Sequence, residues 1–340
     1  MTLLAIETSC DDTCAAVLGD ENQVLSSIVS SQVALHELYG GIVPELASRR
    51  HCENIRWVVE QALLEAQTTL EDVEAVCVTK GPGLVGSLLV GVAYAKSLAY
   101  ARNIDLVGVN HVEGHLLSPL LTNPDLTFPF IGLVVSGGHS SLYLARDWHD
   151  YELLGRTIDD AAGEAFDKVA RMLELGFPGG PVIEKRARSG DPEAIKLPRA
   201  WLGKESLDFS FSGLKTAVRT ALERQKKISG DLIGENFVSD LAASFQEAVT
   251  AVLVRKTLAA AERYQIKNVA MAGGVSCNGY LRRRMSDAAQ LQGVDFFLAP
   301  PKFCTDNAAM IGLVGRRRLA AGLIDDLTLN PSSRLPLMAL

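Results

Sequence analysis

The sequence predicts an α/β protein built from two lobes of related architecture, and three observations support this prediction. At 340 residues, the chain is too long for one ordinary core, so two domains are expected. Hydrophobic residues make up 48% of the chain and charged residues 21%, a balance that is typical of globular proteins. One order of elements, three strands followed by alternating helices and strands, occurs twice along the chain.

The first copy occupies residues 1–109. Its strands are short apolar runs between turn residues, and its helices follow Pro44, which favours a helix start, and Ser87, which is expected to act as a cap. The glycine-rich segment 81–86 joins a strand to a helix. It lacks the lysine of a Walker motif, so a tight turn is at least as well supported as a phosphate loop. We expect strands at 3–6, 14–18, 24–30, 73–79 and 104–109, and helices at 45–66 and 87–100.

The second copy occupies residues 130–325, after a linking segment, 110–129, and before a C-terminal tail, 326–340. Thr305 is expected to cap its last helix, which we expect to pack back toward the first lobe. We expect strands at 130–136, 140–145, 151–156, 268–271 and 294–299, and helices at 158–174, after 181, at 214–223, 234–264, 278–291 and 305–321, with a linker at 226–230.

Two such lobes, with glycine hairpins facing each other, give a duplicated actin-like fold (ASKHA, RNase H-like). In this architecture a nucleotide lies in the cleft between the lobes. Because one fold hosts many chemistries, the function has to come from particular residues.

The linking segment begins with two histidines at helical spacing. His111 and His115 are four residues apart, so a helix would place both imidazoles on one face. A metal site and a pair of hydrogen-bonding groups at a domain junction both remain open. The zinc-protease motif needs a glutamate directly after the first histidine, but Val112 holds that place.

Composition narrows the class of protein further. The six cysteines include no CxxC pair, which favours free thiols in a reducing compartment. No secretory signal is evident, and no apolar run reaches the roughly 18 residues of a membrane span, so we expect a cytoplasmic protein without a membrane partner. The net charge of −7 gives no general attraction to nucleic acid. Any such contact would depend on another subunit or on local basic runs, namely 49–50, 282–284 and 316–318.

Several motifs, in order and nearly from end to end, resemble one family. They lie at 7–13, 40–49, 81–86, 111–115, 135–139, 159–168, 209–216, 273–276 and 304–307. The chain resembles the bacterial TsaD family of tRNA N6-adenosine threonylcarbamoyltransferases. The resemblance implies transfer of a threonylcarbamoyl group from threonylcarbamoyl-adenylate to N6 of adenosine 37, in tRNAs that read codons beginning with A, with release of AMP.

The resemblance also implies a cofactor and partners. The metal ligands would be His111, His115 and Asp306, a donor set that suits one Fe(II) per subunit, with zinc as the alternative. The partners would be tRNA, the paralogous subunit TsaB and the ATPase TsaE. Because the isolated chain is acidic, we expect it to bind tRNA weakly on its own.

Substrate-binding positions follow from the same resemblance: Val134, Val135, Ser136, Gly137, Gly138, Asp167, Gly180 and Asn278. Many relatives have aspartate where this chain has Glu184, which keeps the carboxylate but extends it by one methylene. Asp11 is the candidate for orienting the threonyl group or accepting the N6 proton. Its alternative role is that of an Asx-turn residue that holds a hairpin.

Two other functions compete with this interpretation. An ATP-dependent small-molecule kinase of the same fold would have no use for a His–His–Asp metal site. A metallopeptidase is disfavoured by the position of Glu113, which follows Val112 and not the first histidine.

Overall fold

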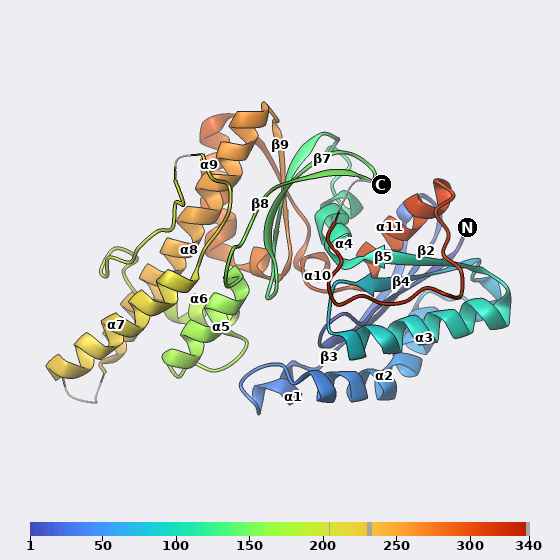
Figure 1. Ribbon diagram of the computed structural model, residues 1–340, viewed down its shortest axis with the longest axis horizontal. Coiled ribbons are helices and arrows are strands. Elements are labelled where there is room, and N and C mark those ends of the chain that lie inside the picture. Colours follow the sequence, from blue (N-terminus) through green and yellow to red (C-terminus); the bar gives the residue numbers. More distant parts are fainter. Residues whose placement is uncertain (204, 230–232, 338–340) are drawn as a thin grey trace. The chain divides into compact units, whose positions relative to one another are not determined.

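The computed structural model describes residues 1–203, 205–229 and 233–337, and the chain divides into two compact units. The first unit comprises Met1–Asp125 and a returning segment that begins at Ala299; the second comprises Leu126–Leu298. Each unit is a five-stranded mixed sheet with helices, so the prediction of two α/β lobes is confirmed (Figure 1).

In the first unit, the strand order is β3-β2-β1-β4-β5. The first three strands pair antiparallel, whereas β4 and β5 continue the sheet in parallel with β1. The carboxyl ends of β1, β4 and β5 therefore meet at one edge. The strands are β1 (Leu3–Glu7), β2 (Asp12–Leu18), β3 (Val24–Ser31), β4 (Ala75–Gly81) and β5 (Asp105–Asn110).

Helices cover both faces of this sheet (Figure 1). Because side chains alternate along a strand, Leu4 and Ile6 enter the core formed with α2 and α3, and Glu7 points to the opposite face. The helices are α1 (Val33–Glu37), α2 (Pro44–Glu65), α3 (Val85–Arg102), α4 (His111–Leu117), α10 (Pro301–Cys304) and α11 (Ala308–Ala320), with 3-10 turns η1 (Asp20–Asn22), η2 (Leu70–Asp72) and η3 (Ser118–Leu121).

The second unit repeats the topology of the first. Its strand order is β10-β9-β6-β7-β8, with β6, β7 and β8 antiparallel and β9 and β10 parallel to β6. The predicted duplication is therefore present strand for strand. The strands are β6 (Phe130–Val135), β7 (Ser140–Asp147), β8 (Asp150–Arg156), β9 (Asn268–Ala272) and β10 (Asp295–Leu298). The helices are α5 (Ala162–Met172), α6 (Gly179–Ala187), α7 (Ser212–Ser229), α8 (Glu235–Tyr264) and α9 (Gly279–Gln292), with the 3-10 turn η4 (Gly274–Cys277).

The second unit ends at Leu298, whereas the sequence prediction extended the second lobe to residue 325. Helix α11 packs on the sheet of the first unit because two glycines let its backbone come close. A Cβ atom on Gly312 would overlap Leu18, and one on Gly315 would overlap Cys77. The predicted tail 326–340 belongs to the same unit as far as it is described; residues 338–340 lie outside the described residues.

Several predicted helix ends were wrong. Leu84, not Ser87, precedes α3, and Ser87 is buried inside the helix. Asn307, not Thr305, caps α11 by accepting a hydrogen bond from the backbone N–H of Met310 at 3.0 Å. Helix α5 begins at Ala162, four residues later than predicted, because Asp159 instead accepts from the backbone N–H groups of Phe211 and Ser212.

Further differences concern element length. Helix α7 is longer than predicted and includes most of the expected linker at 226–230; residue 230 itself lies outside the described residues. The short helices α1 and α10 were not predicted at all, because four or five residues give no readable hydrophobic period.

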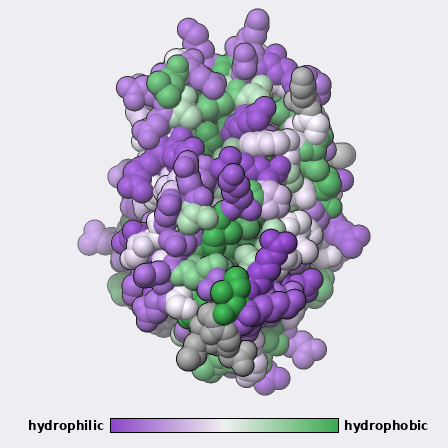
Figure 2. Space-filling view, turned by 90° about the vertical axis from the view of Figure 1, so that its left-hand side faces the viewer, coloured by the Kyte–Doolittle hydropathy of each residue, from purple (hydrophilic) through white to green (hydrophobic). Residues whose placement is uncertain are grey.

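One helix among the described residues could cross a membrane by its length and composition alone. Helix α8 is long and apolar enough by length and composition, but 72% of its apolar window is buried inside the protein. Its side chains, among them Leu241, Phe245 and Leu253, form the core of the second unit. On the face drawn in Figure 2, hydrophilic side chains predominate and apolar ones gather in small patches.

Candidate functional site

Helix α4 carries both histidines and begins directly at the end of β5. Asn110 caps it: the side-chain oxygen accepts hydrogen bonds from the backbone N–H groups of Val112 and Glu113 at 2.8 and 3.3 Å. The amide nitrogen of Asn110 donates to the carbonyl of Leu335 at 3.0 Å. The cap places His111 in the first turn, and His115 follows one turn later on the same side.

His111, His115 and Asp306 come together in the first unit. One ligand atom from each lies within 4.8 Å of the other two. Oδ1 of Asp306 is 3.0 Å from Nε2 of His115 and 3.7 Å from Nε2 of His111. The two rings meet edge to face, with centroids 4.7 Å apart. Two histidines of α4 and an aspartate 191 positions after His115 thus form one cluster, as the resemblance led us to expect.

The donor set fits a transition metal. Two imidazole nitrogens and one carboxylate, with further positions open, form a set that is used for Fe(II) and also for zinc. Both histidines are buried, and Asp306 is partly exposed, so the cluster is held by the core yet accessible at its carboxylate.

Acidic groups dominate the electrostatics around the cluster. Burial tends to lower the pKa of His111, but Glu7 and Asp306 outweigh this effect and raise it to about 9. Burial tends to raise the pKa of Glu7, but the charge and hydrogen bond of His111 leave it lowered. Burial, together with the charge of Asp306, raises the pKa of Asp11 and takes that of Asp12 to about 7. The carboxyl groups of Glu7, Asp11 and Asp12 near Asp306 therefore favour a bound cation at this cluster.

Asp11 lies in the turn between β1 and β2, where its carbonyl accepts from the backbone N–H of Gln32 at 3.1 Å. Its carboxyl group is partly buried, and burial together with the charge of Asp306 raises its pKa, which makes it a stronger base than an exposed carboxylate. His51 braces the same turn by contacting the carbonyl of Cys10 and the hydroxyl of Thr13, at 3.0 and 2.8 Å.

The predicted substrate-binding positions lie in the second unit. Val134 and Val135 end β6, and Ser136, Gly137 and Gly138 form the hairpin to β7. The start of α5 and the turn after β9 lie close to this hairpin. A Cβ atom on Gly163 would lie 2.7 Å from Cα of Gly137, and one on Gly273 would overlap the carbonyl of Val135. A Cβ atom on Gly137 or Gly138 would meet nothing within 4 Å among the described residues, so the tip of the hairpin is open to a ligand.

The remaining predicted positions lie at, or contact, the first residues of α6 and α9. Asp167 accepts from the backbone N–H of Gly179 at 2.7 Å, and Gly180 has open space where a side chain would stand. Asn278 caps α9 and also donates to Gln246 at 2.8 Å, so both ends of its amide have partners. Glu184 lies close to the start of α9: its Oε1 is 3.1 Å from the place that a Cβ atom on Gly279 would take. The same oxygen forms an ion pair with Arg188 at 3.5 Å.

Sequence reasoning missed Glu7. Its carboxylate is completely buried and contacts Nδ1 of His111 at 2.9 Å. A glutamate at the end of an otherwise apolar strand is the one signal that could have revealed it, because a buried carboxylate needs a partner.

The basic runs are engaged within the fold. Arg316 donates to the carbonyls of Met1, Leu18 and Gly19, at the ends of β1 and β2. In the run 282–284, Arg284 pairs with Glu247 at 2.6 Å, and in the run 49–50, Arg50 pairs with Glu53 at 2.7 Å. These guanidinium groups therefore stabilise the units themselves, which limits what they offer to a nucleic acid.

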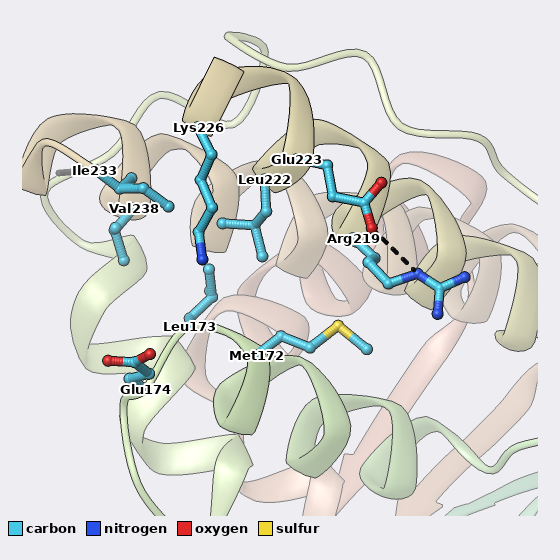
Figure 3. A pocket seen from close by; sticks show the side chains of 9 residues that line it. All are labelled: Met172, Leu173, Glu174, Arg219, Leu222, Glu223, Lys226, Ile233 and Val238. Atoms are coloured by element: carbon cyan, nitrogen blue, oxygen red, sulfur yellow. Dashed lines mark ion pairs between the residues drawn. The ribbon is translucent and has the colours of Figure 1, made fainter. Parts of the chain in front are cut away.

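A pocket of about 530 Å³ opens elsewhere in the second unit, between α5, α7 and α8. Apolar and charged side chains line it together, and two of the charged ones, Arg219 and Glu223, form an ion pair at 3.9 Å (Figure 3). None of the predicted site residues lines it. This pocket therefore lies apart from the predicted site residues.

Comparison with known proteins assigns the chain. The family described as tRNA N6-adenosine threonylcarbamoyltransferase (TsaD) matches residues 23–313. A protein of that name from Syntrophotalea carbinolica is 50% identical over 337 residues, which are 99% of this chain and 97% of the relative. One from Trichlorobacter lovleyi is 52% identical with the same coverage.

Solved structures confirm the fold. Full-length HypF in a phosphate- and nucleotide-bound form matches with a TM-score of 0.61 and 15% identity, over 95% of this chain and 56% of HypF. Component A of the (R)-2-hydroxyglutaryl-CoA dehydratase of Acidaminococcus fermentans matches with a TM-score of 0.54 and 15% identity, over 94% of this chain and 99% of that protein. The duplicated actin-like fold is therefore established.

Proposed function

Because the chain belongs to the TsaD family, we propose that it transfers a threonylcarbamoyl group from threonylcarbamoyl-adenylate to N6 of adenosine 37 in tRNA and releases AMP. The full-length match to relatives of that name supports the activity. The observation that carries the site is the cluster of His111, His115 and Asp306, whose ligand atoms lie within 4.8 Å of one another.

His111, His115 and Asp306 would hold one Fe(II) ion per subunit, or zinc in its place. When bound, the metal supplies Lewis-acid stabilisation of the negative charge that develops on carbonyl and phosphate oxygens. The fit rests on the donor chemistry of the three side chains and on the excess of carboxyl groups around them.

The second unit would bind the adenylate. The hairpin of Ser136, Gly137 and Gly138 can offer backbone N–H groups to a phosphate, because a ligand can approach its open glycines closely. Gly180 leaves room for a flat ring. One carboxylate oxygen of Asp167 already accepts from the backbone N–H of Gly179. The carboxylate can accept further hydrogen bonds, which ribose hydroxyl groups would donate. The side-chain amide of Asn278 already uses its oxygen and one N–H within the protein, so only its second N–H would be available to the base. Glu184 would also contact the substrate, through a side chain one methylene longer than the aspartate of many relatives.

Asp11 would receive the proton. N6 of adenosine attacks the carbamoyl carbon, the bond from that carbon to the phosphate oxygen breaks, and AMP leaves. The attacking nitrogen must lose a proton, and a carboxyl group with a raised pKa is a suitable acceptor. An alternative role for the same carboxylate is to orient the threonyl group.

Partners complete the proposal. The acidic chain, with a net charge of −7 and arginines engaged in its own fold, is poorly equipped to hold tRNA alone. We assign that task to a complex with TsaB and TsaE in the cytoplasm, and we expect weak, salt-sensitive tRNA binding by the isolated chain.

Reconstitution tests this function. The chain is combined with both partners, the enzyme that makes the adenylate, bicarbonate, threonine, ATP and unmodified tRNA. Mass spectrometry of the digested tRNA should show threonylcarbamoylated adenosine. A phosphorylated small molecule with unmodified tRNA would instead support a kinase, and cleavage of peptides that is sensitive to a chelator would support a peptidase.

A further inference from the structure

Glu7 is a fully buried carboxylate in a strand whose other residues are all apolar. It ends β1, at the edge where the carboxyl ends of β4 and β5 also lie, and its side chain points away from the core that Leu4 and Ile6 form. An unpaired charge at such a place would be expensive, so its partners reveal its role.

Three donors surround the carboxylate. Oε1 accepts from the backbone N–H of Ser9, and Oε2 accepts from the hydroxyl of Thr79 at 2.5 Å and from Nδ1 of His111 at 2.9 Å. A carboxylate ringed by donors is an acceptor only. Nδ1 of His111 therefore carries the hydrogen in this contact, and the hydroxyl of Ser9, 3.1 Å from the same nitrogen, can accept from it as well. The lone pair of the neutral ring then resides on Nε2.

Nε2 of His111 is the ring atom that faces the other two members of the cluster, 3.7 Å from Oδ1 of Asp306. His115 lacks a comparable support. Its Nε2 contacts Asp306 at 3.0 Å, but its Nδ1 is buried and has no hydrogen-bond partner among the described residues. The two histidines thus differ in their second ring nitrogen: among the described residues, Nδ1 of His111 contacts a carboxylate and Nδ1 of His115 does not.

We propose that Glu7 is the positioning residue of the metal site: it holds the Nδ1–H of His111 and so turns the Nε2 lone pair toward Asp306 and His115. This inference rests on the proposed metal role of the cluster. A carboxylate behind a ligating histidine fixes the tautomer and the ring orientation, and its loss typically lowers metal affinity about 10- to 100-fold.

The test compares Glu7→Gln with Thr79→Val in the full-length protein. Glu7→Gln keeps the shape but removes the anionic acceptor, whereas Thr79→Val removes a donor to the same carboxylate and leaves the contact with His111 in place. Each metal-stripped protein is titrated with Zn(II) against a competing chelator, and melting temperatures are recorded. Glu7→Gln should bind Zn(II) about 10- to 100-fold more weakly, and Thr79→Val about as tightly as the unaltered chain.

Equal affinities for Glu7→Gln and the unaltered chain would overturn the role of Glu7 and leave the metal site standing. If the unaltered chain bound no Zn(II), Co(II) or Fe(II), the metal role itself would fail, and this inference with it. Loss of folding in Glu7→Gln would move the test to the unaltered chain with ¹⁵N-labelled histidine. There, the NMR signal of the His111 Nδ1–H should persist when Zn(II) binds, and ligation through Nδ1 would refute the proposal.

Discussion

One oxygen atom of Asp306 approaches both histidines of the cluster, at 3.0 Å from His115 and 3.7 Å from His111. Helical spacing of the histidines could be read from the sequence, but their third partner could not, because 191 positions separate His115 from Asp306. Only the resemblance indicated it. Neither the spacing of residues nor the resemblance indicated Glu7, because its role depends on a contact with His111, 104 positions away.

Substitution of Asp11 distinguishes a role in proton transfer from a role in holding the turn. We expect Asp11→Asn to lower the transfer rate by about 10²-fold or more, because the amide cannot accept the N6 proton. The melting temperature and the bound metal should change little. Asp105→Asn, which alters an exposed carboxylate at the start of β5, is the control and should keep full activity. Full transfer activity in Asp11→Asn would exclude the proton-accepting role.

Asp12 should make the metal-stripped protein less stable as the pH rises. Its pKa is raised from 3.8 to about 7, chiefly by burial and then by Asp306, so the folded state holds a proton that the unfolded state releases. Stability is therefore greatest below pH 4 for this group and falls as the pH passes through 7. The loss is on the order of 1.4 kcal/mol for each unit of the shift.

Asp12→Asn removes this loss. Thermal unfolding of the metal-stripped variant should show a gain in melting temperature over the unaltered chain that is larger at pH 8 than at pH 5. A gain that is the same at both values would mean that Asp12 is ionised throughout this range.

At the scale of elements, short apolar runs between turn residues, and helix-start signals such as Pro44, sufficed to place most of the secondary structure. Helix starts were less predictable. Ser87 and Thr305 looked like caps, but α3 begins after Leu84 and α11 after Asn307. Ser87 lies inside α3, where its carbonyl accepts from the hydroxyl of Thr8 at 2.9 Å. Local cap preference is weaker than such tertiary contacts.

Helix α11 brings Asp306 to the cluster, so its seating on the sheet is testable. Gly315→Ala should destabilise the protein by about 1–3 kcal/mol, because the new methyl group would overlap Cys77, including its Cβ atom. Gly213→Ala is the matched control: it lies in α7, where a Cβ atom meets nothing within 4 Å among the described residues, and should be neutral or slightly stabilising. Equal denaturation midpoints for the two variants would mean that α11 is not tightly seated.

At the scale of the whole molecule, the duplicated order of elements predicted two lobes, and both sheets share one topology. The return of the chain from residue 299 to the first unit was only partly foreseen, as a last helix that packs back. No local signal marks such a return, since it depends on surface complementarity between segments some 200 residues apart.

A metal ion would tie this returning segment to the rest of the first unit, because its ligands come from α4 and from Asp306. A metal at 100 times its dissociation constant should therefore stabilise the metal-stripped protein by about 2.7 kcal/mol. Differential scanning calorimetry with and without Zn(II) measures this gain. His111→Ala should show none; a gain of equal size in that variant would place the ion elsewhere.

The central claim is acyl transfer to tRNA, and single-turnover transfer from preformed threonylcarbamoyl-adenylate tests it most directly. The chain with its partners is mixed with unmodified tRNA and adenylate labelled in the carbamoyl carbon, and ATP is left out. We predict one labelled threonylcarbamoyl-adenosine in the digested tRNA for each AMP released. Labelled adenylate that disappears while the tRNA stays unlabelled would contradict the claim.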